Sequence, residues 1–183
     1  MADVQLVRAD EGVSGVVGDQ RVELLAEMPS SRAGIRGESF GARVGGYWRI
    51  ESNYRNLDPA GLFLGEYDGE PVHLRSEVHL TPHYAVRHAD VSGTIGEQEL
   101  QARVAPVEAP AYGPTVVSVD GHFDGAAITL LVTLEGDLSE AHIHGMIGGH
   151  SVSIDATHSS VTGHYEGPEP LFPLLVSCLL YFI

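Results

Sequence analysis

The sequence predicts an all-β protein: a closed antiparallel barrel of about twelve strands, built from repeated hairpins, with a C-terminal hydrophobic helix in its lumen. Three observations predict this fold. Apolar residues alternate with other residues along most of the chain, which is the period of a β-strand. The alternation recurs in units joined by short, glycine-containing segments that suit hairpin turns. The last thirteen residues, 171–183, carry no charge and are apolar on every side.

Each repeat places an apolar residue, a glycine and an apolar residue at alternate positions, followed five residues later by a second alternating apolar pair. The first copy is Val13, Gly15 and Val17 with Val22 and Leu24. Further copies begin at Phe63, Val91, Val119 and Ile143, an irregular copy lies at 41–50, and the last begins at Val161. The repeat therefore predicts six hairpins and an additional strand that leads into the tail.

The spacing of five predicts a two-residue turn, so that Val17 faces Val22 and Gly15 faces Leu24. All apolar residues and the mid-strand glycines then share one face, and the other face is polar. The predicted turns are Gly45-Gly46, Gly69-Glu70, Gly125-Ala126 and Gly149-His150, together with Asp19-Gln20 and Glu97-Gln98. The last two lack glycine but follow Gly18 and Gly96, so a bulged or longer turn is the alternative there. A sheet that is apolar on one face must cover that face, and closure into a barrel also removes its edges.

The apolar tail is the segment that fills the barrel. As a helix it is roughly 20 Å long, whereas the hydrocarbon core of a bilayer is about 30 Å thick. We therefore expect no transmembrane segment, and we place Leu174, Leu175, Leu179 and Phe182 in the lumen. The recurrent glycine predicts sharp curvature or a close approach of the helix backbone. The chain is interpreted as a single domain, 1–183, with the barrel at 1–166 and the central helix at 167–183.

Composition excludes several classes of function. The formal net charge is -15, and all ten basic residues are arginines. Such a surface repels phosphates, so we expect no nucleic-acid partner and weak attraction to anionic lipids. The first twelve residues contain no apolar run typical of a secretory signal, which favours a cytoplasmic protein. Cys178, the single cysteine, excludes an intrachain disulfide and is expected to be a small buried apolar residue.

Arginines and aromatic residues concentrate between residues 32 and 55, next to a connection longer than a hairpin turn. Long loops at the mouth of a rigid barrel are common binding sites. The candidate binding residues are Arg32, Arg36, Arg43, Trp48 and Arg49. No nucleophile or acid–base motif is recognisable, so we predict no catalytic residues and no cofactor. The favoured function is a non-enzymatic binding or scaffold role, with a protein or small molecule as ligand.

The histidines indicate an alternative function, namely a metal site or a metal-dependent enzyme. His142 and His144 lie two residues apart on one strand face, Asp155 is predicted opposite His144, and His164 follows on the next strand. Imidazoles and a carboxylate on one sheet face suit Zn²⁺. A second set, His73, His79, His83 and His88, is spread along a strand and a loop, and the sequence favours it less.

The combination of hairpin repeats and a terminal apolar helix resembles the tubby-like superfamily, which includes the LURP-one-related and scramblase-like proteins. The segment from Val119 to Gly125, VDGHFDG, is similar to the hairpin strands of the LURP-one-related group. The resemblance implies a twelve-stranded barrel threaded by its C-terminal helix. It also implies lipid or phosphoinositide binding through a basic pocket as a second alternative, but no cluster of basic residues in this chain matches that pocket.

Overall fold

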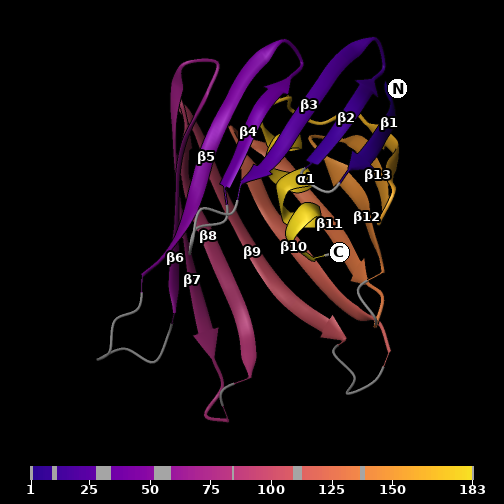
Figure 1. Ribbon diagram of the computed structural model, residues 1–183. Coiled ribbons are helices and arrows are strands. Elements are labelled where there is room, and N and C mark those ends of the chain that lie inside the picture. Colours follow the sequence, from indigo (N-terminus) through magenta and orange to yellow (C-terminus); the bar gives the residue numbers. More distant parts are fainter. Residues whose placement is uncertain are drawn as a thin grey trace.

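The computed structural model describes residues 2–9, 12–27, 34–51, 59–83, 85–108, 113–136 and 139–182. In these ranges the chain forms fourteen β-strands and one α-helix. The strands make one closed antiparallel barrel, in which consecutive strands are neighbours and β1 pairs with β14 (Figure 1). The all-β barrel with a C-terminal helix is therefore confirmed, but it has fourteen strands rather than about twelve.

The strands in chain order are β1 (Ala2–Ala9), β2 (Gly12–Val17), β3 (Gln20–Glu27), β4 (Gly34–Ser39), β5 (Ala42–Glu51), β6 (Ala60–Tyr67), β7 (Glu70–Leu80), β8 (Val86–Ile95), β9 (Gln98–Glu108), β10 (Thr115–Phe123), β11 (Ala126–Leu134), β12 (Glu140–Ile147), β13 (His150–Thr157) and β14 (Ser160–Tyr165). The helix α1 follows at Leu171–Phe182. Strand lengths range from six residues in β2, β4 and β14 to eleven in β7 and β9. The wall is therefore deepest around β7 to β9, as Figure 1 shows.

The repeat predicts β14 as the additional strand that begins at Val161, whereas β1 is the strand that the prediction missed; the two are paired like a hairpin that has no turn. In the first repeat, Gly15 pairs with Val22 on the neighbouring strand. The last repeat starts in β14, and its glycine, Gly163, pairs with Val4 of β1. Val4 and Leu6 therefore occupy the places that Val22 and Leu24 occupy in the first hairpin. The barrel consists of seven equivalent hairpins, and the ends of the described chain divide the seventh.

The turns lie one residue earlier than predicted. Val17 pairs with Gln20, so the first turn is Gly18-Asp19 and not Asp19-Gln20, and Val22 faces Gly15 instead of Val17. The observed turns are Gly18-Asp19, Phe40-Gly41, Asp68-Gly69, Gly96-Glu97, Asp124-Gly125 and Gly148-Gly149. Four of them have positive φ at both positions, as a type I′ turn requires, and the other two place glycine at the single positive-φ position.

The predicted Gly45-Gly46 turn is wrong. Both glycines lie inside β5, where Gly45 pairs with Arg36 of β4 and Gly46 pairs with Gly65 of β6. The hairpin of this repeat closes at Phe40-Gly41 instead.

The mid-strand glycine of each repeat is required by the neighbouring strand and not by the helix. A Cβ atom at any of these positions would overlap a backbone carbonyl oxygen of the preceding strand. At five of the seven, φ lies between 132° and 158°, a range that residues with a side chain rarely adopt. The predicted close approach of the helix backbone is therefore wrong, because the backbone that approaches these glycines belongs to the neighbouring strand. The seven are Gly15, Gly37, Gly65, Gly93, Gly121, Gly145 and Gly163.

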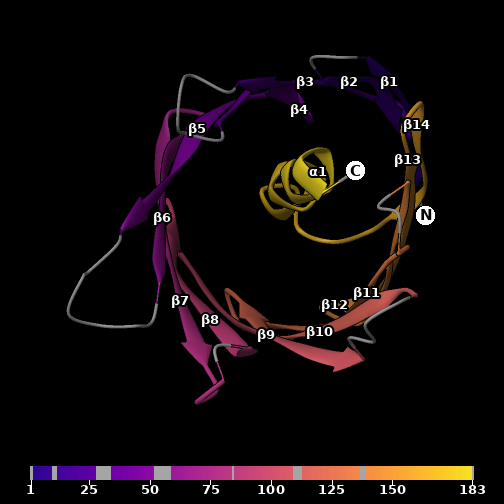
Figure 2. The same cartoon turned by 60° about the horizontal axis from the view of Figure 1, so that its bottom comes forward.

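The helix α1 lies inside the barrel (Figure 2). Its start is positioned by Tyr165, whose hydroxyl donates a 2.6 Å hydrogen bond to the carbonyl oxygen of Pro168. Of the predicted lumen residues, Leu179 is buried and Leu174 and Leu175 are partly buried, whereas the side chain of Phe182 lies outside the described part of the structure. Nowhere in the described ranges is there a helix with the length and apolar character that crossing a membrane requires.

The burial of the Tyr67 hydroxyl leads us to predict that the protein loses stability at alkaline pH. Its hydroxyl is buried and makes no hydrogen bond within the described structure. Burial, and then the negative charges of Glu169 and Asp68, raises the pKa of Tyr67 to about 12. Unfolded tyrosine ionises near pH 10, so above that pH the unfolded state releases a proton that the folded state keeps. The free energy of unfolding therefore falls, because of Tyr67, as pH rises from about 10 towards 12.

Replacing Tyr67 with phenylalanine is expected to raise the free energy of unfolding by about 1 kcal/mol at neutral pH, because it removes an unsatisfied buried hydroxyl. It should also flatten the alkaline loss in urea titrations at pH 7 and above pH 10. The control is Tyr165→Phe, which deletes the hydrogen bond to Pro168 and should destabilise the protein. A Tyr67→Phe variant that is less stable than the parent at both pH values would contradict this account.

Candidate functional site

The helix presents one face to a wall of the barrel and another to water. Its closest packing is against β3 and β4, and Figure 2 shows it displaced towards that wall. Phe172, Val176 and Leu179 are at most 2% exposed. Leu174 and Cys178, one helical turn apart, share another face, on which Leu174 is partly buried and Cys178 is exposed. Water therefore reaches one side of a helix that lies in the lumen.

On the inner face of the wall formed by β8 to β11, several apolar side chains are also incompletely packed. Along each strand, the inward positions lie an even number of residues from buried residues such as Ile95, Leu100 and Leu130, and they therefore share the inner face with them. Five of these inward residues remain partly exposed: Val91, Val104, Val119, Val132 and Leu134. On the walls nearer the helix, by contrast, Val22, Leu24 and Ile154 are fully buried. The described lumen is thus dry near the turn ends of β8 to β11, where Ile95, Phe123 and Leu130 are buried, and accessible to water towards the other ends of these strands.

Cys178 lies exposed on the open face of α1, so the prediction of a buried cysteine is wrong. The surrounding barrel nevertheless removes much of the water around its sulfur. This burial raises the pKa of the Cys178 thiol, and a hydrogen bond with Ser177 opposes the rise. The thiol is therefore protonated and weakly nucleophilic at neutral pH. It offers a chemical label inside the lumen rather than a catalytic group.

The described candidate binding residues between 32 and 55 lie on both faces of the barrel wall. Arg36 and Arg43 line a groove of about 250 Å³ on the outer surface of β3 to β5, together with Glu23, Leu25, Gly37 and Glu38. Arg49, also on the outer face, donates a 2.8 Å hydrogen bond to Glu51. The groove thus brings together two of the predicted residues but balances them with two carboxylates.

Trp48 does not belong to that surface. It points inward and packs edge-on against Phe63, with ring centroids 5.3 Å apart. Arg32 lies outside the described residues. The five predicted binding residues therefore do not form one surface in the described structure.

The residues of the predicted histidine site also do not come together. Asp155 lies opposite His142 and not opposite His144, because the turn before β13 falls one residue earlier than expected. His142 Nδ1 and Asp155 Oδ1 are 2.7 Å apart. His164 Nε2 lies 3.0 Å from Ser151 Oγ, and both His144 and His164 pair with Ser153 across the sheet. The result is one imidazole–carboxylate pair and two separate histidines.

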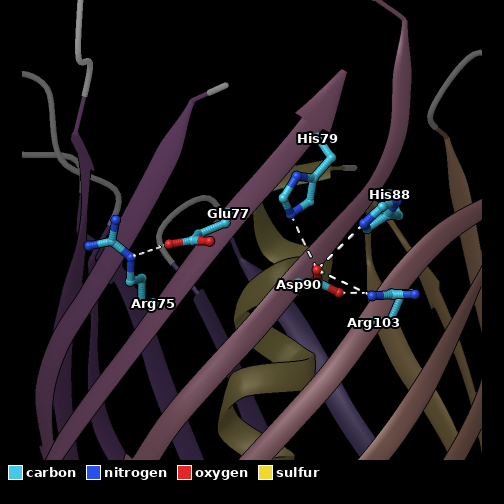
Figure 3. Close-up of polar contacts among 6 residues, drawn as sticks. All are labelled: Arg75, Glu77, His79, His88, Asp90 and Arg103. Atoms are coloured by element: carbon cyan, nitrogen blue, oxygen red, sulfur yellow. Dashed lines mark hydrogen bonds and ion pairs between the residues drawn. The ribbon is translucent and has the colours of Figure 1, made fainter. Parts of the chain in front are cut away.

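A different pair of histidines converges with a carboxylate on the outer face of β7 and β8 (Figure 3). His79 and His88 are direct cross-strand partners, and Asp90 lies two residues beyond His88 on the same face. The imidazole rings are 4.5 Å apart, and their Nε2 atoms lie 3.2 Å and 3.5 Å from Asp90 Oδ2. Among the described residues this is the only set of three or more potential metal ligands that gathers so closely. We call it the His79–His88–Asp90 cluster.

Arg103 holds the carboxylate of this cluster in place. Arg103 lies opposite Asp90 on β9 and donates hydrogen bonds of 2.8 Å from Nε to Oδ1 and 3.4 Å from Nη2 to Oδ2. The bonded guanidinium lowers the pKa of the Asp90 carboxyl, and it does so against a partial loss of hydration. Asp90 is consequently ionised at neutral pH and its orientation is set by the neighbouring strand.

Sequence reasoning passed over this cluster because it treated His79 and His88 as parts of a strand and a loop. The 81–85 connection is centred on residue 83, so a regular hairpin would pair His79 with Arg87. The register shift after His79 leaves Arg87 as an extra residue in β8 and so places His79 opposite His88 and Glu77 opposite Asp90.

Comparisons of this chain with protein-family models, with curated proteins and with solved structures found no match.

Proposed function

We propose that the protein is a non-enzymatic binding protein that holds a long apolar chain, such as an alkyl chain, between α1 and the β8–β11 wall. One observation carries the proposal: inward apolar residues of that wall, including Val104 and Val119, are reached by water. The open face of α1 carries Leu174, which is apolar, and Cys178, which is weakly polar. A ligand that fits this space must therefore be apolar.

The size of the barrel supports this proposal. Fourteen strands spaced about 4.8 Å apart and tilted by about 40° trace a ring roughly 28 Å across. An α-helix with its side chains is about 10–12 Å wide, less than half of that diameter. One helix packed against β3 and β4 therefore fills only part of the lumen, in agreement with the partial exposure of Val104 and Val119 on the opposite wall.

The energetics also favour an apolar ligand. Water beside valine and leucine side chains finds few hydrogen-bond partners, so its displacement is favourable. Each methylene group moved from water into such a space contributes about 0.8 kcal/mol, close to a fourfold change in affinity. An alkyl chain is therefore expected to bind more tightly as it lengthens, until the space is full.

Competition between Nile red and a series of primary alcohols tests the proposal. We expect dye fluorescence to rise on binding, and octanol, decanol and dodecanol to displace the dye with increasing affinity. The alcohols should also slow alkylation of Cys178, because they would cover the open face of α1. Competition without any dependence on chain length, together with unprotected Cys178, would exclude a lumen site.

Two tryptophan substitutions locate the site. Val119→Trp adds a large side chain to the inner wall and should weaken alcohol binding at least tenfold. Ser118→Trp, the matched control, adds the same side chain at the neighbouring position, which faces outward and pairs with Leu131; it should bind as the parent does. Equal loss in both variants would place the ligand elsewhere.

The tubby-like resemblance remains a prediction alongside this proposal. It supplies a reason to expect a binding role rather than catalysis, and it leaves lipid binding as the related alternative. The present proposal differs from phosphoinositide binding, because it assigns recognition to the apolar lumen and not to a basic surface pocket. The groove at Arg36 and Arg43, with Glu23 and Glu38 beside them, lacks the net positive charge that such a pocket needs.

A further inference from the structure

We infer that the His79–His88–Asp90 cluster is a binding site for a divalent transition-metal ion of the zinc type, separate from the lumen. The inference rests on the convergence of three donor atoms, His79 Nε2, His88 Nε2 and Asp90 Oδ2, which all lie within 4.8 Å of one another. It is independent of the proposed apolar ligand, because the cluster lies on the outer face of the sheet.

Two of the three spacings between the donors match zinc coordination. Four ligands placed tetrahedrally at about 2.0–2.1 Å from a zinc ion lie about 3.3–3.4 Å from one another. The two distances from Asp90 Oδ2 to the imidazole nitrogens are 3.2 Å and 3.5 Å. An ion can therefore enter between the three atoms with small side-chain movements, and a water molecule would complete the tetrahedron from the solvent side.

The donor types select the class of metal. Two imidazoles and one carboxylate suit Zn²⁺, Cu²⁺ or Ni²⁺, whereas Mg²⁺ and Ca²⁺ prefer shells of six or more oxygen atoms. The side chains of His79 and Asp90 are 36% and 39% exposed, so an ion reaches them directly from solvent. The formal net charge of -15 further favours the approach of a cation.

Neighbouring side chains orient the residues of the cluster before a metal ion binds. Arg103 binds Asp90 Oδ1 at 2.8 Å and Oδ2 at 3.4 Å, and this orientation also turns Oδ2 towards the histidines. Carboxylates that are oriented by a second residue in this manner are a common feature of metal sites. Glu77, which pairs with Asp90 across the strands, is engaged by Arg75 at 2.8 Å and so does not compete for the imidazoles. The register between β7 and β8 shifts immediately after His79, an irregularity of the kind often found beside functional sites.

Calorimetric titration of the untagged chain with ZnCl₂ tests the inference. We expect one equivalent of Zn²⁺ to bind, with no comparable binding of MgCl₂ or CaCl₂. His79→Ala, His88→Ala and Asp90→Asn should each weaken zinc binding at least tenfold. Co²⁺ should produce the strong visible absorption of a four-coordinate site in the parent and lose it in His88→Ala.

Two other histidines provide matched controls. His73→Ala removes an exposed imidazole from the same face of β7, outside the cluster, and should leave zinc binding unchanged. His142→Ala removes the imidazole that pairs with Asp155 and should also have no effect. These are exposed or half-exposed positions, so each variant should unfold within about 0.5 kcal/mol of the parent. Zinc binding that survives in His88→Ala, or that disappears in His142→Ala, would overturn the assignment.

Discussion

Replacing Leu179 with aspartate is expected to prevent the protein from folding. Leu179 is 2% exposed and lies in the helix that fills one side of the barrel. A carboxylate there would be buried without a partner, at a cost of several kcal/mol, against a total stability of about 5–15 kcal/mol for a typical domain. The expected result is insoluble protein, or soluble protein without a cooperative thermal transition in circular dichroism.

Cys178→Asp is the matched control for that experiment. It introduces the same group at the neighbouring position, where water reaches the side chain. We expect this variant to fold with a much smaller loss of stability. If Leu179→Asp folded cooperatively and as stably as Cys178→Asp, α1 could not be the structural core of the barrel.

Replacing Gly145 with alanine is expected to lower the free energy of unfolding by about 3 kcal/mol or more. Gly145 has a φ of 150°, and a Cβ atom there would overlap the carbonyl oxygen of Thr129 and crowd the Cα atom of Leu130. These are backbone atoms of the neighbouring strand, so a change of side-chain rotamer gives no relief. Urea unfolding followed by fluorescence or circular dichroism measures the loss.

Gly45→Ala distinguishes this effect from the general cost of altering a strand glycine. Gly45 also lies within a strand, but its φ is not positive and an added Cβ atom would meet only Glu66 Cγ, at 3.8 Å. We expect a change within about 0.5 kcal/mol, or a slight stabilisation. Similar losses at Gly145 and Gly45 would mean that backbone overlap is not the reason for the repeated glycine.

The face of each strand could be predicted from the sequence, but the position of each turn could not. Alternation defines which residues share a face, and a change in pairing by two residues leaves every side chain on the same side. Val17 and Val22 therefore point inward in both the predicted and the observed registers, although they are not partners. The Asp68-Gly69 and Asp124-Gly125 pairs were the local signals for the correct register, because Asp-Gly favours a type I′ turn.

Strand number and site residues depend on pairings between distant parts of the chain. β1, at Ala2–Ala9, contains no glycine and precedes the first repeat, so the repeat does not include it; its pairing with β14 makes it part of the seventh hairpin. The histidine cluster requires the register between β7 and β8 together with Asp90. Residue type and spacing favoured His142 and His144, which are two residues apart, over His79 and His88, which are nine residues apart and meet only through strand pairing.

The division of the seventh hairpin has a consequence for synthesis of the protein. β1 precedes all the other described strands and its partner β14 follows them, so one edge of β1 stays unpaired until β14 has been synthesised. The apolar helix follows β14. Every described strand that surrounds the helix is therefore synthesised before it, so the strands that cover its apolar side chains are available when the helix emerges from the ribosome.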